Sequence, residues 1–129
     1  PDADFFLMRA AEAYLNFAEA DARINGGQTT EEGTAAINAI RKRAHASTRE
    51  DKGYSLSDIC DEWSREFYFE GRRRMDLIRF NRYGGNVNYN WQWKGGTKEG
   101  RNFSENLNIF AIPTNELTSN KNLTQNPGY

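Results

Sequence analysis

A stripe of apolar and small residues near the start of the chain constrains its fold most strongly. Between residues 7 and 22 these residues recur every three or four positions, which is the spacing of one face of an α-helix. Asp4 is suited to cap the start of this helix. The sequence INGG follows, and Gly26 favours the left-handed conformation that ends many helices. The pattern predicts one helix that ends at this stop.

A second stripe begins almost at once. Thr29 and Glu32 fit a capping box, and small and branched apolar residues then continue to about His45. Two helices joined by so short a link pack as an antiparallel hairpin. The sequence therefore predicts a tetratricopeptide-like helical hairpin over residues 4–45, and it contains one such unit rather than an array.

The segment SREFYFEGRRRMDLIRF predicts a third, longer helix. Apolar residues at helical spacing run from residue 59 to residue 80, and Ser55 or Ser57 is available as a cap. Three adjacent aromatics, residues 67–69, would cover most of the helix surface and so predict burial on most sides. Gly71 disfavours a regular helix interior. We expect a long helix over residues 57–83, kinked near this glycine.

The remainder, residues 84–129, is rich in Gly, Asn, Ser and Thr and predicts an irregular loop-rich segment. LNIFAIP favours a short strand, and NEL a single helical turn. Only 37% of all residues are hydrophobic and the mean hydropathy is -0.89. The chain is thus expected to be all-α with a thin core, part of which comes from chain outside these residues.

Charge and cysteine content exclude several classes of protein. The 17 Lys and Arg against 18 Asp and Glu leave a net charge of -1, so no global field favours nucleic acid or an anionic membrane. The single cysteine, Cys60, excludes an intrachain disulfide and a multi-cysteine metal site. No run of apolar residues is long enough to span a membrane, and no signal peptide is recognisable.

The arginines that follow Gly71 suggest either an anion site or structural ion pairs. Helical spacing favours ion pairs, because acids lie three or four residues from each arginine. The pairs predicted by this spacing are Asp61 with Arg65, Glu70 with Arg74, and Arg72 with Asp76. We assign a structural ion-pair motif to Glu66, Glu70, Arg73 and Asp76.

No constellation predicts catalysis. Glu62, Glu66 and Glu70 form a ladder of carboxylates, but His45 is the only histidine and lies in another segment, which argues against a metal site. Cys60 lies on an apolar face and is interpreted as a small buried residue. Phosphate-binding and dinucleotide-binding motifs are absent from the sequence. We therefore predict no catalytic residues, no metal and no cofactor.

The segment NVNYNWQWKGG carries the strongest indication of ligand binding. Tyr89, Trp91 and Trp93 alternate along it, so an extended conformation would place the three rings on one side. Aromatic faces of this kind stack on sugar rings, and nearby polar side chains can reach hydroxyl groups. The alternative is that the rings fold back over missing core. Both interpretations stay open at this point.

Five segments, in order, resemble the SusD/RagB family: RAAEAYLNFAEA, INAIRKRA, EFYFEGRRRMDLIRF, IFAIP and NLTQNPGY. The long helix carries the most specific part of this resemblance, at Glu66, Glu70, Gly71, Arg73 and Asp76. One departure is Arg74, which stands where relatives place an aromatic residue.

The resemblance implies a larger α/α superhelical fold, of which this chain is the C-terminal portion. It also implies a lipoprotein held on the Bacteroidetes outer membrane by an N-terminal lipid that lies outside this chain. Such proteins bind oligosaccharides or other nutrients without catalysis and deliver them to a SusC-like TonB-dependent transporter. The family supplies no catalytic residues, and its ligand-contacting aromatics are not among the shared motifs.

Two other functions remain as alternatives. An intracellular tetratricopeptide-like scaffold would bind other proteins and would have further hairpins upstream. A glycan-cleaving enzyme would need a pair of acids at a sugar site.

Overall fold

The computed structural model describes residues 5–85 and 89–129. These residues are helical or irregular, and the described part contains isolated β-bridges but no strand. The chain forms two compact units, Pro1–Arg73 and Arg74–Tyr129. The expectation of an all-α protein is confirmed.

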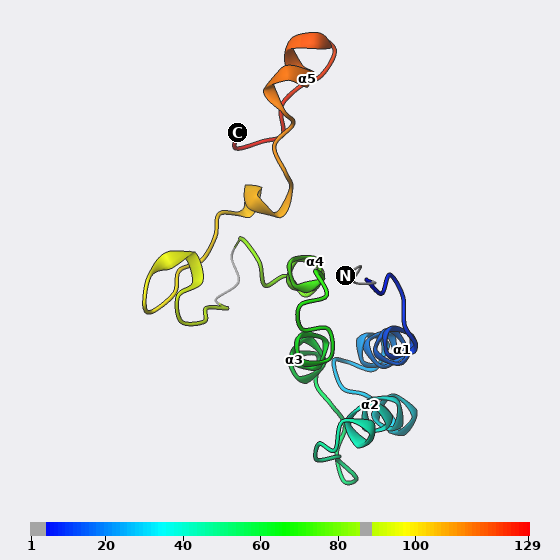
Figure 1. The fold of residues 1–129 in the computed structure, drawn as a ribbon. Helices are drawn as coiled ribbons and strands as arrows, with labels where there is room; N and C mark the ends of the chain where they lie inside the picture. Colours follow the sequence, from blue (N-terminus) through cyan, green and yellow to red (C-terminus); the bar gives the residue numbers. More distant parts are fainter. Residues whose placement is uncertain (1–4, 86–88) are drawn as a thin grey trace, which may run out of the picture. The chain divides into compact units, whose positions relative to one another are not determined.

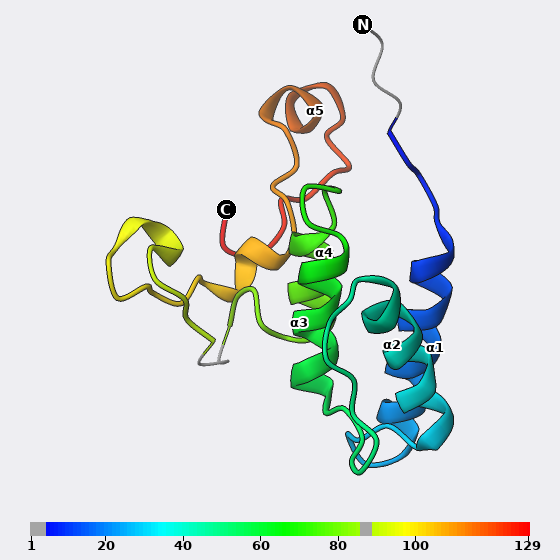
Figure 2. The ribbon, with the colours of Figure 1, turned by 60° about the horizontal axis from the view of Figure 1, so that its bottom comes forward.

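The first unit contains the predicted hairpin. Helix α1 (Ala10–Ile24) and helix α2 (Glu31–Arg43) lie side by side, and helix α3 (Leu56–Glu66) packs against α1 (Figures 1 and 2). The fully buried residues Leu15, Ile37 and Trp63 come from these three helices. The core of this unit is therefore the junction of the hairpin with α3.

The ends of α1 follow the sequence pattern in part. The proposed cap, Asp4, lies outside the described residues, and the helix begins after Arg9, which makes no side-chain capping bond. At the other end Gly26 has φ +71°, as a left-handed helix stop requires. The stop signal was thus correct, and the helix starts six residues later than the expected cap.

The capping box predicted at Thr29 does not form. The N-cap of α2 is Thr30, and its backbone N–H donates to Asp21 Oδ2 at 2.7 Å. The Thr30 hydroxyl donates to Asp21 Oδ1 at 2.9 Å. A carboxylate of α1 thus caps α2. A Cβ at Gly33 would lie 2.1 Å from Asp21 Oδ2, so a larger residue here would displace the carboxylate that caps α2.

Helix α3 begins with a capping box. The side chain of Ser55 accepts from the Asp58 N–H at 3.1 Å, and Asp58 Oδ2 accepts from the Ser55 N–H at 2.8 Å. One of the two predicted caps is therefore confirmed. Asp58 also binds Arg49 at 2.8 Å, which ties the preceding loop to the start of the helix.

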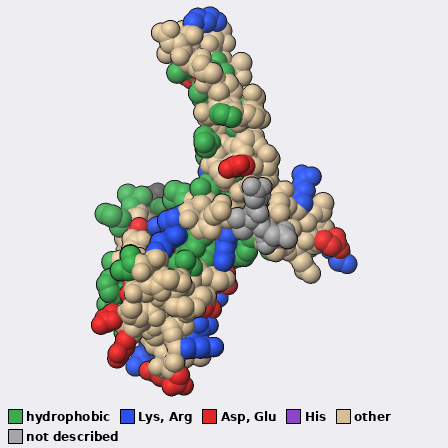
Figure 3. Space-filling view, turned by 180° about the vertical axis from the view of Figure 1, so that it is seen from behind, with side chains coloured by type: hydrophobic (Ala, Val, Ile, Leu, Met, Phe, Trp, Pro, Cys, Tyr) green, Lys and Arg blue, Asp and Glu red, His purple; other side chains and the backbone are tan. Residues whose placement is uncertain are grey.

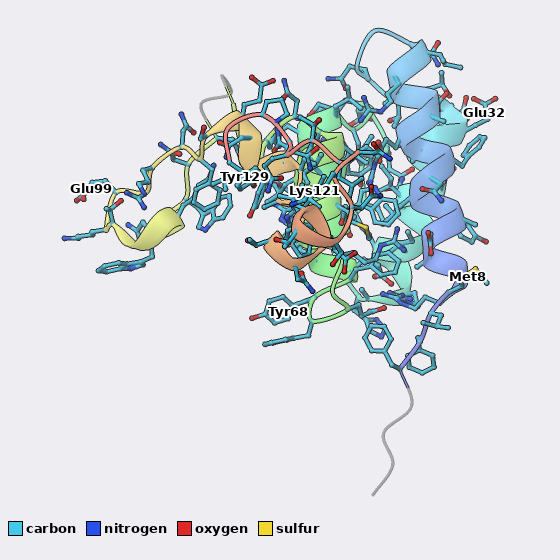
Figure 4. The ribbon with its side chains drawn as sticks, turned by 90° about the horizontal axis from the view of Figure 1, so that it is seen from above. Met8, Glu32, Tyr68, Glu99, Lys121 and Tyr129 are labelled. Carbon is cyan, nitrogen blue, oxygen red and sulfur yellow. The ribbon has the colours of Figure 1, made fainter. Side chains whose placement is uncertain are left out.

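The long kinked helix expected over residues 57–83 is wrong, because α3 ends at Glu66 and helix α4 spans Arg73–Arg79. Phe69 and Gly71 have φ of +62° and +71°, and right-handed helix requires negative φ. Of the three adjacent aromatics only Phe67 is buried, whereas Tyr68 and Phe69 are exposed. Tyr68 projects from this turn in Figure 4. The expected burial of the aromatic triplet is therefore also wrong.

The second unit is built mainly from loops. After α4 it contains two 3₁₀ turns, η1 (Lys94–Gly96) and η2 (Glu105–Asn108), and the short helix α5 (Thr114–Ser119). The NEL turn is confirmed as part of α5. The strand expected at LNIFAIP is absent from the described residues, and side chains of the tail bond to its backbone instead. Gln125 bonds to both N–H and C=O of Ile112 at 2.9 Å.

Large apolar side chains remain exposed on the first unit. Figure 3 shows hydrophobic side chains gathered along one of its edges, and the most exposed near the start of the chain are Phe5, Phe6, Leu7 and Met8. Tyr14 and Phe17 of α1 line an open apolar groove of about 450 Å³ against α2. The thin core inferred from composition therefore corresponds to apolar surface that this chain leaves uncovered.

Candidate functional site

The carboxylate ladder of α3 is neutralised by arginines. Glu62 is 5% exposed and its Oε2 lies 2.6 Å from Arg41 Nη1 and 2.7 Å from Arg65 Nη2. Buried carboxylates are stable in proteins when such partners satisfy them. Among the described residues no cluster of His, Cys, Asp and Glu could hold a metal ion.

Glu66 and Glu70 share one arginine. Arg9, just before α1, binds Glu66 and donates to Glu70 at 2.8 and 2.9 Å. Arg43 adds a bond to Glu66 at 2.5 Å. Burial acts to raise the pKa of Glu66, but the bonds from Arg43 and Arg9 outweigh it and lower that pKa. These contacts join the start of α1, the end of α2 and the end of α3.

The arginine triplet has partners other than those predicted by helical spacing. Arg72 pairs with Glu12 of α1 at 2.7 Å, and Arg73 donates to the Cys60 carbonyl at 2.8 Å. Arg74 donates to the Leu107 carbonyl at 2.8 Å. The spacing argument failed for Arg72 and Arg74 because residues 67–72 do not continue the helix, so residues four apart no longer face each other. Within α3, Arg65 pairs with Glu62, three residues before it.

The other acid of the assigned ion-pair motif, Asp76, is 1% exposed. Its Oδ1 accepts from Arg79 Nη1 at 2.9 Å. These contacts fit a structural role for the motif, which stays a prediction.

The aromatic residues expected to bind ligand belong to a compact loop, here called the aromatic loop and defined as residues 89–103. Tyr89 and Trp91 meet edge to face, with ring centres 5.9 Å apart. Trp91 is 43% exposed and Trp93 is 64% exposed. The structure therefore presents two tryptophan surfaces to solvent.

The backbone of the aromatic loop is a turn and not a strand. Trp93 has φ +67° and ψ 4°, a conformation that costs a non-glycine residue about 1 to 3 kcal/mol. The Trp93 carbonyl accepts from the Gly96 N–H at 2.9 Å, and Gly100 donates to the Thr97 carbonyl at 2.9 Å. A Cβ at Gly100 would lie 2.2 Å from the Trp91 carbonyl oxygen. The expected alternation of three rings along an extended segment is therefore wrong.

The sequence did not indicate Lys94, a buried residue of the aromatic loop that contacts the rings of Trp91 and Phe103. Its exposure is 2%, and its Nζ donates to the Tyr89 carbonyl at 2.8 Å. Nζ also lies 4.9 Å from the centre of the Trp91 ring and 5.1 Å from that of Phe103. Burial lowers the pKa of this lysine. A lysine in a Gly-rich polar segment predicts exposure, so no sequence signal indicated this site.

A polar pocket of about 550 Å³ in the first unit is a second concave site, lined by residues of α2 and of the loop 49–53. Asn38 binds both N–H and C=O of Arg49, at 3.1 and 2.7 Å. The Tyr54 hydroxyl donates to Asn38 at 2.8 Å. Because these polar groups already satisfy one another, the pocket is a weaker candidate than the aromatic loop.

Comparisons with known proteins agree on one family. The model of the SusD family matches residues 2–129. Starch-binding protein SusD of Bacteroides thetaiotaomicron is 44% identical over the whole chain. A SusD superfamily protein from Parabacteroides distasonis has a TM-score of 0.73 and 26% identity over 97% of the chain. A laminarin binding SusD-like protein has a TM-score of 0.67 and 26% identity over 97% of the chain.

The chain spans only part of each relative. It covers 22% of starch-binding protein SusD and 27% and 23% of the two solved structures. The expectation that this chain is the C-terminal portion of such a protein is not borne out by these matches. Within the described residues, no helix has both the length and the apolar character needed to cross a membrane.

Proposed function

This chain belongs to the SusD family, and from this premise we propose that it takes part in non-catalytic binding of glycan through the aromatic loop. The observation that carries the proposal is the exposure of Trp91 and Trp93 on a loop with a fixed backbone. Indole faces provide large, rigid surfaces at low cost in side-chain entropy. Two relatives are described as binding starch and laminarin, which makes a glucan a reasonable first ligand to test.

The absence of catalysis is part of the proposal. Arginines bind Asp58, Glu62 and Glu66 of α3. Asp76 of α4 is likewise bound by Arg79. Glycosidases need an acid pair with contrasting protonation at the sugar. We expect no release of reducing ends when the full-length protein is incubated with starch or laminarin, and a steady release would contradict this part of the proposal.

We further propose that the full-length protein is an outer-membrane lipoprotein that passes its ligand to a SusC-like TonB-dependent transporter. Family membership supports this part of the proposal. Affinity purification of the tagged full-length protein from detergent-solubilised outer membranes should recover a TonB-dependent transporter. Recovery of the tagged protein alone, from a fraction that holds intact transporter complexes, would contradict it.

A tetratricopeptide-like scaffold remains the alternative, because α1 and α2 leave Tyr14 and Phe17 exposed beside an apolar groove. The sequence upstream of this chain separates the two functions. A signal peptide ending in a lipobox cysteine supports the nutrient-binding lipoprotein, whereas a run of further hairpins without one supports the scaffold.

Retention of the full-length protein in affinity electrophoresis tests glycan binding most simply. Gels that contain soluble starch or laminarin should slow its migration relative to a glycan-free gel. Unchanged migration in both gels would remove glucan binding from the proposal.

A further inference from the structure

We propose that Lys94 is a positioning residue, which fixes the ring plane of Trp91 and so prepares it to stack on a sugar. This inference rests on the proposed glycan-binding function of the aromatic loop. It assigns a role to a buried residue that touches the tryptophan but is itself shielded from a ligand.

The ammonium group of Lys94 lies among aromatic faces. It is 4.9 Å from the centre of the Trp91 ring and 5.1 Å from the centre of the Phe103 ring. Cations within about 6 Å of a ring centre are attracted to its face, and this attraction is stronger when water is excluded. At 2% exposure the ammonium is shielded from solvent, so both ring contacts are of the stronger kind.

The position of this ammonium is fixed by the backbone of the loop. The Lys94 N–H donates to the Trp91 carbonyl at 3.1 Å, and the Lys94 carbonyl accepts from the Arg101 N–H at 3.0 Å. Nζ itself is held by the Tyr89 carbonyl at 2.8 Å. The residue thus connects both sides of the loop, and its side chain cannot swing away without breaking these contacts.

Trp91 is consequently held at two places. The ammonium contacts one part of the ring, and the Tyr89 ring meets it at an interplanar angle of 64°. The 43% of the residue that remains exposed is the surface available to a ligand. Among the described residues, no ring or cation contact involves Trp93, so only one of the two tryptophans depends on Lys94.

Stability and binding measured together distinguish a structural role of Lys94 from a positioning role. Burying an ammonium is costly unless it is fully satisfied. Lys94→Met removes this cost, but it also takes from the Tyr89 carbonyl the donor that it has in the wild type. These two effects oppose each other, so Lys94→Met should leave the melting temperature close to that of the wild type. A loss of binding in a variant that is no less stable would identify positioning as the function of the lysine.

The test uses the full-length protein, with soluble starch and laminarin as probes in affinity electrophoresis. Lys94→Met should weaken retention roughly fivefold, the factor that corresponds to one cation–π contact of moderate strength. Lys94→Arg, which keeps a cation, should retain most of the binding. If Lys94→Met binds like the wild type, or if its weaker binding is matched by a lower melting temperature, the proposal is wrong.

A pair of double variants separates action through Trp91 from a general effect on the loop. In the Trp91→Ala background, Lys94→Met should cause no further loss of retention, because the ring that it positions is gone. In the Trp93→Ala background the roughly fivefold loss should persist. An equal effect of Lys94→Met in both backgrounds would overturn the proposal.

If neither starch nor laminarin slows the protein, the proposed glycan-binding function is contradicted, but the role of Lys94 toward Trp91 is not. A measurement without ligand then tests that role. The part of the acrylamide quenching that disappears in Trp91→Phe reports the Trp91 ring, whatever other tryptophans the full-length protein contains, and Trp63 is fully buried. Lys94→Met should increase this quenching because the ring is released. Unchanged quenching would show that Lys94 does not position Trp91.

Discussion

The indole Nε1 of Trp63 donates a hydrogen bond to Glu19 Oε2 at 3.0 Å. Trp63 is 0% exposed and Glu19 is 4% exposed, so the bond lies within the core of the first unit. The other carboxylate oxygen of Glu19 accepts from Arg23 at 2.8 Å. The bond between Trp63 and Glu19 joins α3 to α1 within the core that α3 forms with the hairpin.

Trp63→Phe tests this bond. The substitution leaves a buried carboxylate oxygen of Glu19 without its indole donor and removes side-chain volume, so we expect a loss of about 2 to 3 kcal/mol in the free energy of unfolding. Urea denaturation measures it. Glu19→Gln keeps an acceptor for the indole and should cost less than Trp63→Phe. If Trp63→Phe lowers the free energy of unfolding less than Glu19→Gln does, the hydrogen bond between Trp63 and Glu19 does not stabilise the core.

Arg9 provides a second test, because it joins the start of α1 to Glu66 and Glu70. Its side chain is 23% exposed, so Arg9→Ala should cost about 2 to 4 kcal/mol, toward the lower end of the range for breaking a buried pair. Arg43 also binds Glu66 but is 58% exposed, and Arg43→Ala should cost less than about 1 kcal/mol. If the two variants lose the same free energy of unfolding in thermal or urea denaturation, the burial of Arg9 does not make its ion pairs more stabilising than that of Arg43.

The pairs at Asp58 and Glu66 predict loss of stability in acid. The hydrogen bond from Arg49 holds the pKa of Asp58 well below its ordinary 3.8. A carboxylate with a depressed pKa in the folded state stabilises the protein above its unfolded pKa, and this stability is lost as pH falls through the folded value. Stability should therefore decline as pH drops below about 4.

Arg49→Met should flatten this decline, because Asp58 would then titrate closer to its ordinary pKa. Urea unfolding at a series of pH values from 3 to 7 measures the effect. An identical pH dependence in the variant and the wild type would count against the assigned ion pair.

The first unit was largely predictable because its signals are local. The apolar stripes each lie within one helix, the Gly26 stop and the Ser55 cap act within one helical turn, and the structure contains all three. The break after Glu66 was not predictable by the same means. Phe69 has φ +62°, which no aromatic residue favours intrinsically. On either side of Gly71, Glu70 binds Arg9 and Arg72 binds Glu12, contacts between distant residues that no local pattern reveals.

The aromatic loop was predictable in composition but not in geometry. Alternating aromatics would share one side of an extended segment, yet Trp93 takes a left-handed conformation within a tight turn. The glycines that follow it indicated a turn, but not which ring would be exposed. Lys94 was missed because its burial depends on Phe103, nine residues further along the chain.

Two glycines of the aromatic loop form a matched test of its backbone. Gly96 and Gly100 both have positive φ, of +83° and +74°, but only at Gly100 would a Cβ collide with backbone, the Trp91 carbonyl. Gly96→Ala should cost about 1 kcal/mol from strain alone. Gly100→Ala should cost more and should also weaken retention in starch or laminarin gels. Equal effects on retention would mean that the loop geometry does not matter for binding.

The central claim, that exposed tryptophans of the aromatic loop bind glycan, is tested most directly by calorimetric titration of the full-length protein with the glucan that it retains. Trp91→Ala and Trp93→Ala should each weaken binding about tenfold or more, with the melting temperature unchanged. Tyr68→Ala, which removes an exposed aromatic outside the loop, serves as the control and should bind normally. Lower melting temperatures for the two tryptophan variants with unaltered affinity would show instead that the rings only cover the core.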